Sequence, residues 1–314
     1  MITIWVPKRL VEVDLYNVAA RSPQALAQLS ENSYARRVQY AAQKVRGSGA
    51  KIVMLTGPSA SGKTTSAHCL AKALVQQGTP AQVVSLDNFF KGAAYYPKMP
   101  DGTLDYENLE TLDLPLIKQC LRQLSETGKT ELPIYDFATE QRSAAVEPID
   151  LQGGVCIVEG IHALNPELTP QISAEDKYKI YVSALTTISL DDHNWIPTTD
   201  NRLLRRIIRD FNYRGYSAQE TISRWPSVRA GEDKWIFPYQ ENADVMFNSA
   251  LLFEFAVLRC HAEPILTSVP RNCPEYAEAY RLMKFIKYFT PVQDKEIPPT
   301  SLLREFLGGS SFKY

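Results

Sequence analysis

The segment Gly57-Pro58-Ser59-Ala60-Ser61-Gly62-Lys63-Thr64 matches the spacing G-x-x-x-x-G-K-[ST] at every fixed position. A short apolar run, residues 51–56, precedes it and is typical of a buried strand. Residues 66–77 follow with apolar side chains at helical spacing, and Gly78 is a helix stop signal. The order strand, glycine loop, helix therefore predicts a phosphate-binding loop rather than an ordinary glycine-rich turn.

The residue types of this loop suit the phosphates of a nucleotide. Gly57 and Gly62 carry no Cβ, so the backbone can curl and approach a phosphate closely. The loop N–H groups and the positive end of the following helix favour anions. Lys63 is predicted to reach the β and γ phosphates, and the Thr64 hydroxyl to bind Mg²⁺. The predicted nucleotide contacts are Gly57, Pro58, Ser59, Ala60, Ser61, Gly62, Lys63, Thr64 and Thr65.

The composition excludes several other classes of protein. The chain has 34 Lys and Arg against 35 Asp and Glu, so its overall charge indicates neither a nucleic-acid nor a membrane partner. Its five cysteines include no C-x-x-C pair, which argues against a zinc site or a disulfide framework. No apolar stretch is long enough to span a membrane, and the first residues lack the layout of a secretory signal. We therefore expect a soluble, cytoplasmic protein.

Short apolar runs separated by helical segments indicate an α/β fold with a parallel sheet covered on both faces. The expected strands are residues 51–56, 81–86, 155–158, 178–182 and 244–247. With the phosphate-binding loop, this pattern predicts the three-layer sandwich of P-loop NTPases. Ligands of such folds gather at the carboxyl ends of the strands.

The expected organisation has three parts. Residues 1–47 form a lead-in with an amphipathic helix over 30–45, residues 48–250 form the central domain with the phosphate-binding loop, and residues 251–314 form a C-terminal helical extension with a tail. Within the central part, residues 89–150 are rich in Tyr, Pro, Asp and Gly. They predict one helix around 114–125, with the rest forming loops and a small hairpin region over the substrate.

Two carboxylates follow predicted strands. Asp87 comes after the second strand, where it would face the γ phosphate and deprotonate an acceptor hydroxyl. The alternative is a turn aspartate that caps the next segment. Glu159 ends the strand 155–158, which is the position of an acid that organises Mg²⁺, usually through water. Its alternative is an acid satisfied by local backbone donors.

Arginines cluster in a third region. Arg202, Arg205, Arg206 and Arg209 are spaced three or four apart and so are expected on one side of a helix, with Leu203, Ile207 and Asp210 elsewhere. The simplest interpretation is a solvated basic face. Clustered guanidinium groups, however, suit bidentate phosphate contacts, and a lid carrying them would stabilise transition-state charge and exclude water. We therefore expect Arg202 and Arg206 to act in catalysis and Arg205 to contact the nucleotide.

These motifs together resemble the uridine kinase (uridine-cytidine kinase) family, of the phosphoribulokinase/uridine kinase group. They occur in the family's order over about residues 51–249: the loop 57–65, the segment 86–90, 133–137 with Arg142, 157–161, and 202–209 with Arg214. The tail 301–310 resembles that of a divergent bacterial branch called uridine kinase-like.

The resemblance implies ATP or GTP as donor, Mg²⁺ as cofactor, and a nucleoside 5′-hydroxyl as acceptor. Asp87 matches the general base of the family. The residues that match its substrate contacts are Asp105, Tyr135, Phe137, Arg142 and Arg214, while Arg202, Arg205 and Arg206 match the lid. Core packing is the alternative for Tyr135 and Phe137. Relatives are commonly oligomeric, so the resemblance also allows a homo-oligomer.

The chain departs from the family where the base is recognised. Glu140 stands where a histidine usually contacts the pyrimidine, and Glu220 stands where a base-contacting glutamine is usual. The residues after Asp105 also differ from the family pattern. A carboxylate accepts hydrogen bonds where an imidazole can donate them, which leaves the acceptor open. A sugar or another hydroxylated metabolite is a second hypothesis, and a non-catalytic nucleotide-binding regulatory module is a third.

Overall fold

The computed structural model describes residues 10–99, 102–136 and 139–312 of the chain. The predicted substrate contact Phe137 lies outside these residues. The chain divides into two compact units. The sheet unit comprises residues 36–182 and 227–247, and the terminal unit comprises the described residues of 10–35, 183–226 and 248–312.

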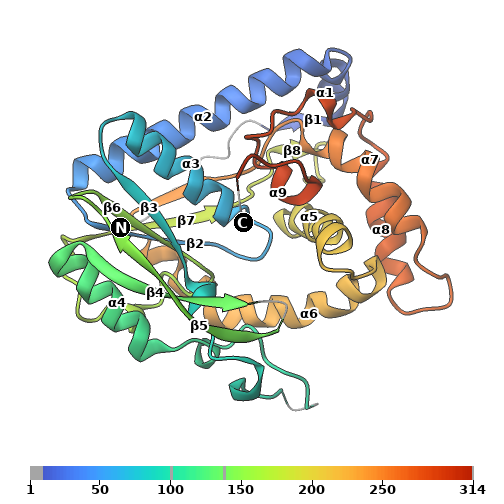
Figure 1. The fold of residues 1–314 in the computed structure, drawn as a ribbon. Helices are drawn as coiled ribbons and strands as arrows, with labels where there is room; N and C mark the ends of the chain where they lie inside the picture. Colours follow the sequence, from blue (N-terminus) through green and yellow to red (C-terminus); the bar gives the residue numbers. More distant parts are fainter. Residues whose placement is uncertain (1–9, 100–101, 137–138, 313–314) are drawn as a thin grey trace. The chain divides into compact units, whose positions relative to one another are not determined.

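A central sheet organises the sheet unit, and its strand order is β3-β6-β2-β7-β9 (Figure 1). Its strands are β2 (Ile52–Thr56), β3 (Ala81–Ser85), β6 (Val155–Glu159), β7 (Lys177–Ser183) and β9 (Val245–Asn248). The pairs β2–β6, β2–β7 and β3–β6 are parallel. All residues of β2 and β6 are buried, as expected of strands covered on both faces. The predicted α/β fold with a parallel sheet is confirmed.

Helices of this unit form where the sequence supplies their start and stop signals. Helix α3 (Lys63–Gln76) follows the phosphate-binding loop. Helix α4 (Leu114–Thr127) begins after Asp113, whose carboxylate accepts a hydrogen bond from the Leu116 N–H, and ends at Gly128 with a left-handed φ of 73°. The predicted helix at 114–125 is confirmed, and its buried side chains belong to the same hydrophobic core as residues of β2, β3 and β6.

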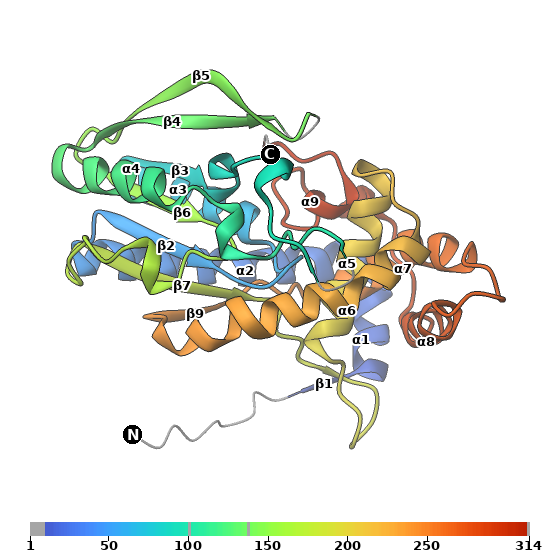
Figure 2. The same cartoon turned by 90° about the horizontal axis from the view of Figure 1, so that it is seen from below.

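The predicted hairpin is formed by β4 (Lys129–Asp136) and β5 (Gln141–Asp150), which pair antiparallel. A register shift between Pro133 and Tyr135 bends the ladder. Figure 2 shows the hairpin beyond α4, outside the strands of the central sheet. Nearly all of β5 is exposed, so one face of the hairpin borders solvent.

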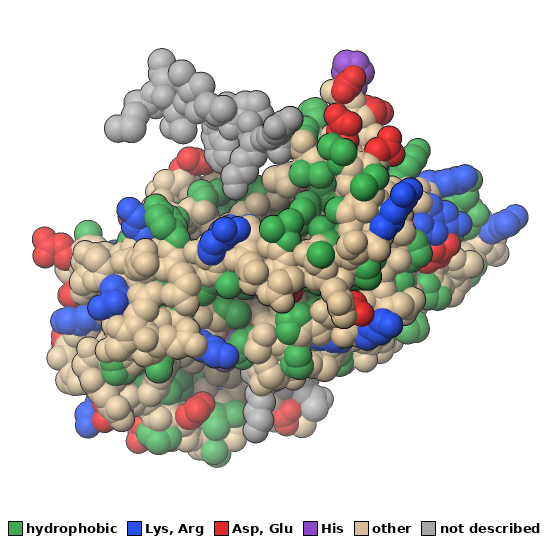
Figure 3. Space-filling model, turned by 90° about the horizontal axis from the view of Figure 1, so that it is seen from above, with side chains coloured by type: hydrophobic (Ala, Val, Ile, Leu, Met, Phe, Trp, Pro, Cys, Tyr) green, Lys and Arg blue, Asp and Glu red, His purple; other side chains and the backbone are tan. Residues whose placement is uncertain are grey.

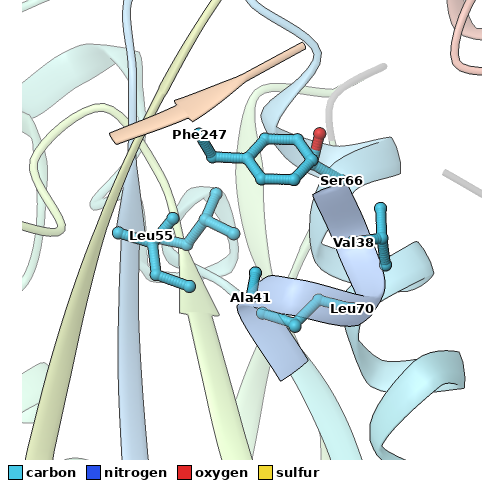
Figure 4. A pocket seen from close by; sticks show the side chains of 7 residues that line it. Val38, Ala41, Leu55, Ser66, Leu70 and Phe247 are labelled. Carbon is cyan, nitrogen blue, oxygen red and sulfur yellow. The ribbon is translucent and has the colours of Figure 1, made fainter. Parts of the chain in front are cut away.

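The long helix α2 (Pro23–Ser48) contains the predicted amphipathic helix at 30–45 but begins seven residues earlier, at Pro23. The side chains expected on one face are all buried: Tyr34, Val38, Ala41, Ala42 and Val45. Residues 36–48 of α2 cover α3 and the sheet around a small apolar gap, in which Leu55 and Phe247 face Val38 and Ala41 (Figure 4). We do not assign this gap to the active site, because its lining offers almost no polar group.

The terminal unit is mainly helical. Its elements are β1 (Val11–Glu12), α1 (Val13–Ala20), β8 (Ile188–Ser189), α5 (Thr198–Tyr213), α7 (Glu254–Thr267), α8 (Tyr276–Ile286) and α9 (Arg304–Leu307). Helix α5 packs against α7 and α9, and α7 packs against α8. The rings of Tyr16, Phe255, Phe285 and Phe289 form its aromatic core. Helices α7, α8 and α9 lie within the range 251–314, for which a helical extension was expected.

Helix α6 (Ala218–Trp235) contains Pro226, and the division between the two units falls at this proline. Residues 183–226 group with both chain ends, whereas the sequence-based division assigned them to the central kinase domain. No described helix is long and apolar enough to cross a membrane. Basic side chains are spread over the face drawn in Figure 3, with acidic ones among them, in keeping with the net charge of −1.

Candidate active site

The phosphate-binding loop connects β2 to α3 at the carboxyl edge of the sheet (Figure 1). Gly57 lies so close to the neighbouring strand that a Cβ there would stand 2.1 Å from the carbonyl oxygen of Val182. Gly62 has a left-handed φ of 81° directly before α3. The geometry of the loop thus requires glycine at both positions of the motif.

The loop is tied to its surroundings by polar contacts. The Lys63 ammonium donates to the carbonyl oxygen of Pro58 at 3.1 Å, so the side chain curls back over the loop. The Ser59 N–H donates to the carboxylate of Glu232 at 2.9 Å. Behind the loop, the Thr56 hydroxyl donates to the carbonyl oxygens of Gly160 and Ile161 at 2.9 and 2.7 Å. The loop is therefore a preformed, well-supported structure.

The two predicted carboxylates lie at neighbouring strand ends. Glu159 pairs in register with Leu55 of β2 and with Ser85 of β3. The Ser85 hydroxyl donates to the Glu159 carboxylate at 2.8 Å and accepts from the Asp87 N–H at 3.3 Å. Asp87 itself is exposed on the turn that follows β3, while Glu159 is buried. One hydroxyl thus links the segments that carry both acids.

Aromatic side chains gather beside Asp87, and the sequence analysis identified only one of them. Tyr135 is buried, and its hydroxyl lies 3.2 Å from that of Tyr96. The Phe90 ring lies 5.5 Å from the Tyr135 ring and 5.8 Å from the Tyr96 ring, and Tyr106 packs edge-on against Tyr96. Burial raises the pKa of Tyr96. The abundance of tyrosine between residues 89 and 150 was the available signal for this cluster.

Three predicted substrate contacts lie in the same region. Asp105 accepts a hydrogen bond from the Asn108 amide at 3.0 Å. Arg142 pairs with Asp113 at 3.0 Å and also donates to the carbonyl oxygens of Phe89 and Phe90 at 3.3 Å. Arg142 therefore holds the segment after Asp87 in place. Glu140 is exposed in the hairpin turn with a left-handed φ of 52°.

His162 is a buried polar side chain that sequence reasoning missed. It lies three residues after Glu159 and is only 2% exposed, with its ring packed edge-on against Trp235. Desolvation lowers its pKa to about 4, although the Glu107 carbonyl and the Asp105 carboxylate act in the opposite direction. His162 is therefore neutral at neutral pH.

This shift predicts a pH dependence of stability. Unfolded His162 binds a proton below about pH 6.5, but the folded protein binds one there only near pH 4. The free energy of unfolding should therefore fall between pH 6.5 and 4, by about 3 kcal/mol from this group. Urea titrations of the wild type and of His162→Asn at several pH values will measure it. Identical pH slopes for the two proteins would contradict the prediction.

The arginine-rich helix, α5, is not the solvated basic face of the simplest interpretation. Arg202 and Arg205 are 1% and 0% exposed. The Arg205 guanidinium pairs with the buried Glu254 carboxylate at 2.6 Å and lies over the Phe306 ring. Because a carboxylate already neutralises this guanidinium, its position favours a structural role over the predicted nucleotide contact. The Arg202 guanidinium lies over the Trp225 ring.

The remaining arginines of this segment converge on one acid. Arg206, Arg209 and Arg214 lie 3.2, 2.8 and 3.7 Å from the buried carboxylate of Asp210. The expectation that Asp210 lies away from the arginine face was wrong, because residue 210 is one helical turn beyond Arg206.

Removing Arg205 should destabilise the protein. Arg205→Ala leaves the buried Glu254 with only its hydrogen bonds from Asn201 and the Leu251 N–H, at 3.0 and 3.1 Å. Breaking a buried ion pair costs about 3–5 kcal/mol, and we expect a loss of that size in the free energy of unfolding. The control is Arg122→Ala, which breaks an exposed pair with Glu126 and should cost under about 1 kcal/mol. Equal losses of unfolding free energy in the two variants would show that the buried pair contributes no more to stability than the exposed one.

Glu220, singled out at the position of a base-contacting glutamine, caps a helix. Its carboxylate accepts from the Ser217 N–H and hydroxyl at 2.8 and 2.7 Å, which lowers its pKa. Ser217 and Glu220 thus form the capping box that starts α6.

A parallel sheet with a G-x-x-x-x-G-K-[ST] loop at its carboxyl edge and acids at the adjacent strand ends defines a P-loop nucleotide-binding fold. The model of the phosphoribulokinase/uridine kinase family matches residues 52–251, and the chain belongs to that family. It is therefore a nucleotide-binding phosphotransferase that acts on a hydroxyl group, which sets aside the hypothesis of a non-catalytic module.

Curated relatives match the same region. The chain is 27% identical over 196 residues to a uridine kinase of Ureaplasma urealyticum serovar 10, covering 62% of this chain and 86% of that protein. It is 30% identical over 199 residues to a uridine kinase of Lactobacillus helveticus, covering 62% and 84%. A solved structure described as a candidate fructose transport system kinase, from Silicibacter sp. TM1040, has a TM-score of 0.50 at 22% identity, covering 67% and 98%, and supports the fold alone.

Proposed function

We propose that this chain transfers the γ-phosphoryl group of ATP to the 5′-hydroxyl of a nucleoside. The observation that carries the proposal is the register of the sheet. Glu159 lies beside the end of β2, the strand before the phosphate-binding loop, and beside Ser85, which stands two residues before Asp87. The matched relatives named uridine kinase support the nucleoside as acceptor.

Asp87 is the proposed general base. It is exposed, so an acceptor hydroxyl can reach it, and the Ser85 hydroxyl holds its backbone N–H. A positioned carboxylate that removes the proton of an attacking hydroxyl contributes about 10²- to 10⁴-fold to the rate. Lys63 is the proposed counter-charge for the transferred group.

The residues at the loop fit a magnesium ion. A hydroxyl on the first turn of α3, Thr64, and a carboxylate at the adjacent strand end, Glu159, are oxygen ligands of the kind Mg²⁺ prefers. We propose that Thr64 binds the ion directly and Glu159 through water. When bound, the ion neutralises charge on the β and γ phosphates.

The proposed acceptor pocket is the aromatic cluster of Phe90, Tyr96, Tyr106 and Tyr135 together with Asp105. Aromatic faces suit a base, and a carboxylate suits the hydroxyl groups of a ribose. From their match to the family's lid arginines and substrate-side arginine, we also propose a role for Arg202, Arg206 and Arg214 on the migrating phosphoryl group. Arg205 is left out because its guanidinium is fully buried against its own partner Glu254, whereas Arg206 and Arg214 share the one carboxylate of Asp210.

A sugar or another hydroxylated metabolite is the second candidate acceptor. The observation that favours it is Glu140, an exposed carboxylate in the hairpin turn where the family usually has a base-contacting histidine. A coupled ADP-release assay over nucleosides, sugars and sugar phosphates separates the two. The proposal expects turnover with at least one nucleoside at a kcat/KM at least tenfold above every sugar, and a reversed ranking overturns it.

A further inference from the structure

Glu232 of α6 occupies an unusual position for an acidic residue. Its side chain is fully buried, and its carboxylate accepts the N–H of Ser59 in the phosphate-binding loop at 2.9 Å. A loop that binds phosphate groups presents its N–H groups to negative charge. Here one of these groups is held by a carboxylate of the protein itself.

The negative charge of Glu232 is balanced locally. Arg229, one turn earlier in α6, donates to the Glu232 carboxylate at 2.7 Å, and its guanidinium lies over the ring of Phe237. The same guanidinium also lies 3.7 Å from the exposed carboxylate of Asp233, so it offsets the charge of Glu232 while bridging two acids of the helix. Further along the helix, Trp235 packs against His162, which fixes this part of α6 to the edge of the sheet.

Glu232 is fully buried while Arg229 is 30% exposed, and burying a carboxylate is a poor device for stability alone, because well-packed apolar residues of similar size often stabilise as much or more. Here the ion pair instead fixes the orientation of the Glu232 carboxylate. A carboxylate held by Arg229 presents a fixed acceptor to one N–H of the loop, and a hydrogen bond to a charged group is among the stronger ones. The loop then needs no ordering when a nucleotide arrives.

We propose that Glu232 is a positioning residue that holds the phosphate-binding loop in its nucleotide-binding conformation through the Ser59 N–H. The kinetic consequence rests on the proposed function, but the binding consequence requires only that the loop binds a nucleotide. If a smaller fraction of the protein holds the loop in the nucleotide-binding conformation, the apparent dissociation constant of the nucleotide rises in inverse proportion to that fraction.

Two substitutions separate the hydrogen bond from the charge. Glu232→Gln and Glu232→Ala remove the same negative charge, but only Glu232→Ala removes the acceptor oxygen. Any effect of charge on nucleotide affinity is therefore common to both. Glu241→Ala is the matched control, since Glu241 lies in the same unit shortly after α6, is exposed and is not in contact with Arg229 or Glu232 in the described structure.

The measurements are ADP binding by calorimetry and hydrogen exchange of a peptide spanning residues 57–62. We expect Glu232→Ala to bind ADP about tenfold more weakly than Glu232→Gln, and its free loop to exchange about tenfold faster. Saturating ADP should reduce the difference in exchange, and Glu241→Ala should match the wild type. Equal affinity and equal exchange in the two Glu232 variants, within twofold, overturn the proposal.

A third measurement covers the case in which Glu232→Ala does not fold. The Ser59 N–H of the free wild-type protein should be protected from exchange, and rapid exchange at this position overturns the proposal without any variant. Failure of every acceptor to turn over would instead contradict the proposed function, and it would leave the binding and exchange results unaffected.

Discussion

Asp87→Asn is expected to lower turnover by about 10²- to 10⁴-fold, because the amide keeps the shape of the side chain but cannot take the proton of the acceptor hydroxyl. The affinity for ADP should stay within about threefold of the wild type, since Asp87 follows β3 and is not part of the phosphate-binding loop. Steady-state kinetics with the best acceptor, together with calorimetry, measure both quantities.

The control for Asp87→Asn is Glu126→Gln, which neutralises an exposed acid on α4 and should leave both quantities unchanged. An Asp87→Asn variant that keeps more than a tenth of the wild-type rate would refute the assignment of the base. A variant that loses ADP affinity as much as rate would show that Asp87 supports the donor site instead.

Gly57→Ala is expected to reduce ADP affinity by about 100-fold or more. The new methyl group would stand 2.1 Å from the Val182 carbonyl oxygen and 2.7 Å from the Ser61 hydroxyl, so the backbone of the loop must move. Displacements of about 1 Å at a site that positions a substrate cost about 10²-fold. Overpacking should also lower the free energy of unfolding by about 1–3 kcal/mol.

Gly47→Ala provides the comparison for Gly57→Ala. Gly47 lies in α2, and a Cβ there would meet no atom within 4 Å, so the substitution should keep ADP affinity and stabilise the helix by up to about 1 kcal/mol. Calorimetry and urea titration of both variants test the pair. If Gly57→Ala binds ADP like Gly47→Ala, the loop tolerates the methyl group and its described geometry is wrong.

The sheet and the phosphate-binding loop could be predicted because their signals are local. Each strand is a short apolar run with its own turn residues, and the loop with its flanking strand and helix spans fewer than about 30 consecutive residues. Parallel pairing then brings the ends of β2, β3 and β6 to one edge, which is why Asp87 and Glu159 could be selected in advance.

The contacts that sequence reasoning missed join residues far apart in the chain. Glu232 reaches Ser59 across 173 positions, and nothing in the local sequence of either marks the pairing. The spacing of the arginines in α5 correctly predicted a helix, but spacing cannot reveal that Glu254 lies opposite Arg205. Helix geometry alone therefore could not distinguish an arginine of a lid from one that is buried in an ion pair.

The identity of the acceptor depends on positions at which the chain departs from the family pattern, above all Glu140 and the residues around Asp105. Tyr96 and Phe90 enter the candidate pocket only through folding, because the segment after Asp87 turns back onto the hairpin at Tyr135. A pocket assembled from such distant segments cannot be predicted from any one of them.

The central claim is phosphoryl transfer from ATP to a nucleoside 5′-hydroxyl, and phosphorus NMR of a turnover mixture tests it most directly. With ATP, Mg²⁺ and the preferred nucleoside, the account predicts ADP and a nucleoside 5′-monophosphate in equal amounts. The 5′-deoxy form of the same nucleoside should give neither product. Phosphate on another hydroxyl, or ADP with free phosphate and no phosphorylated acceptor, would contradict the account.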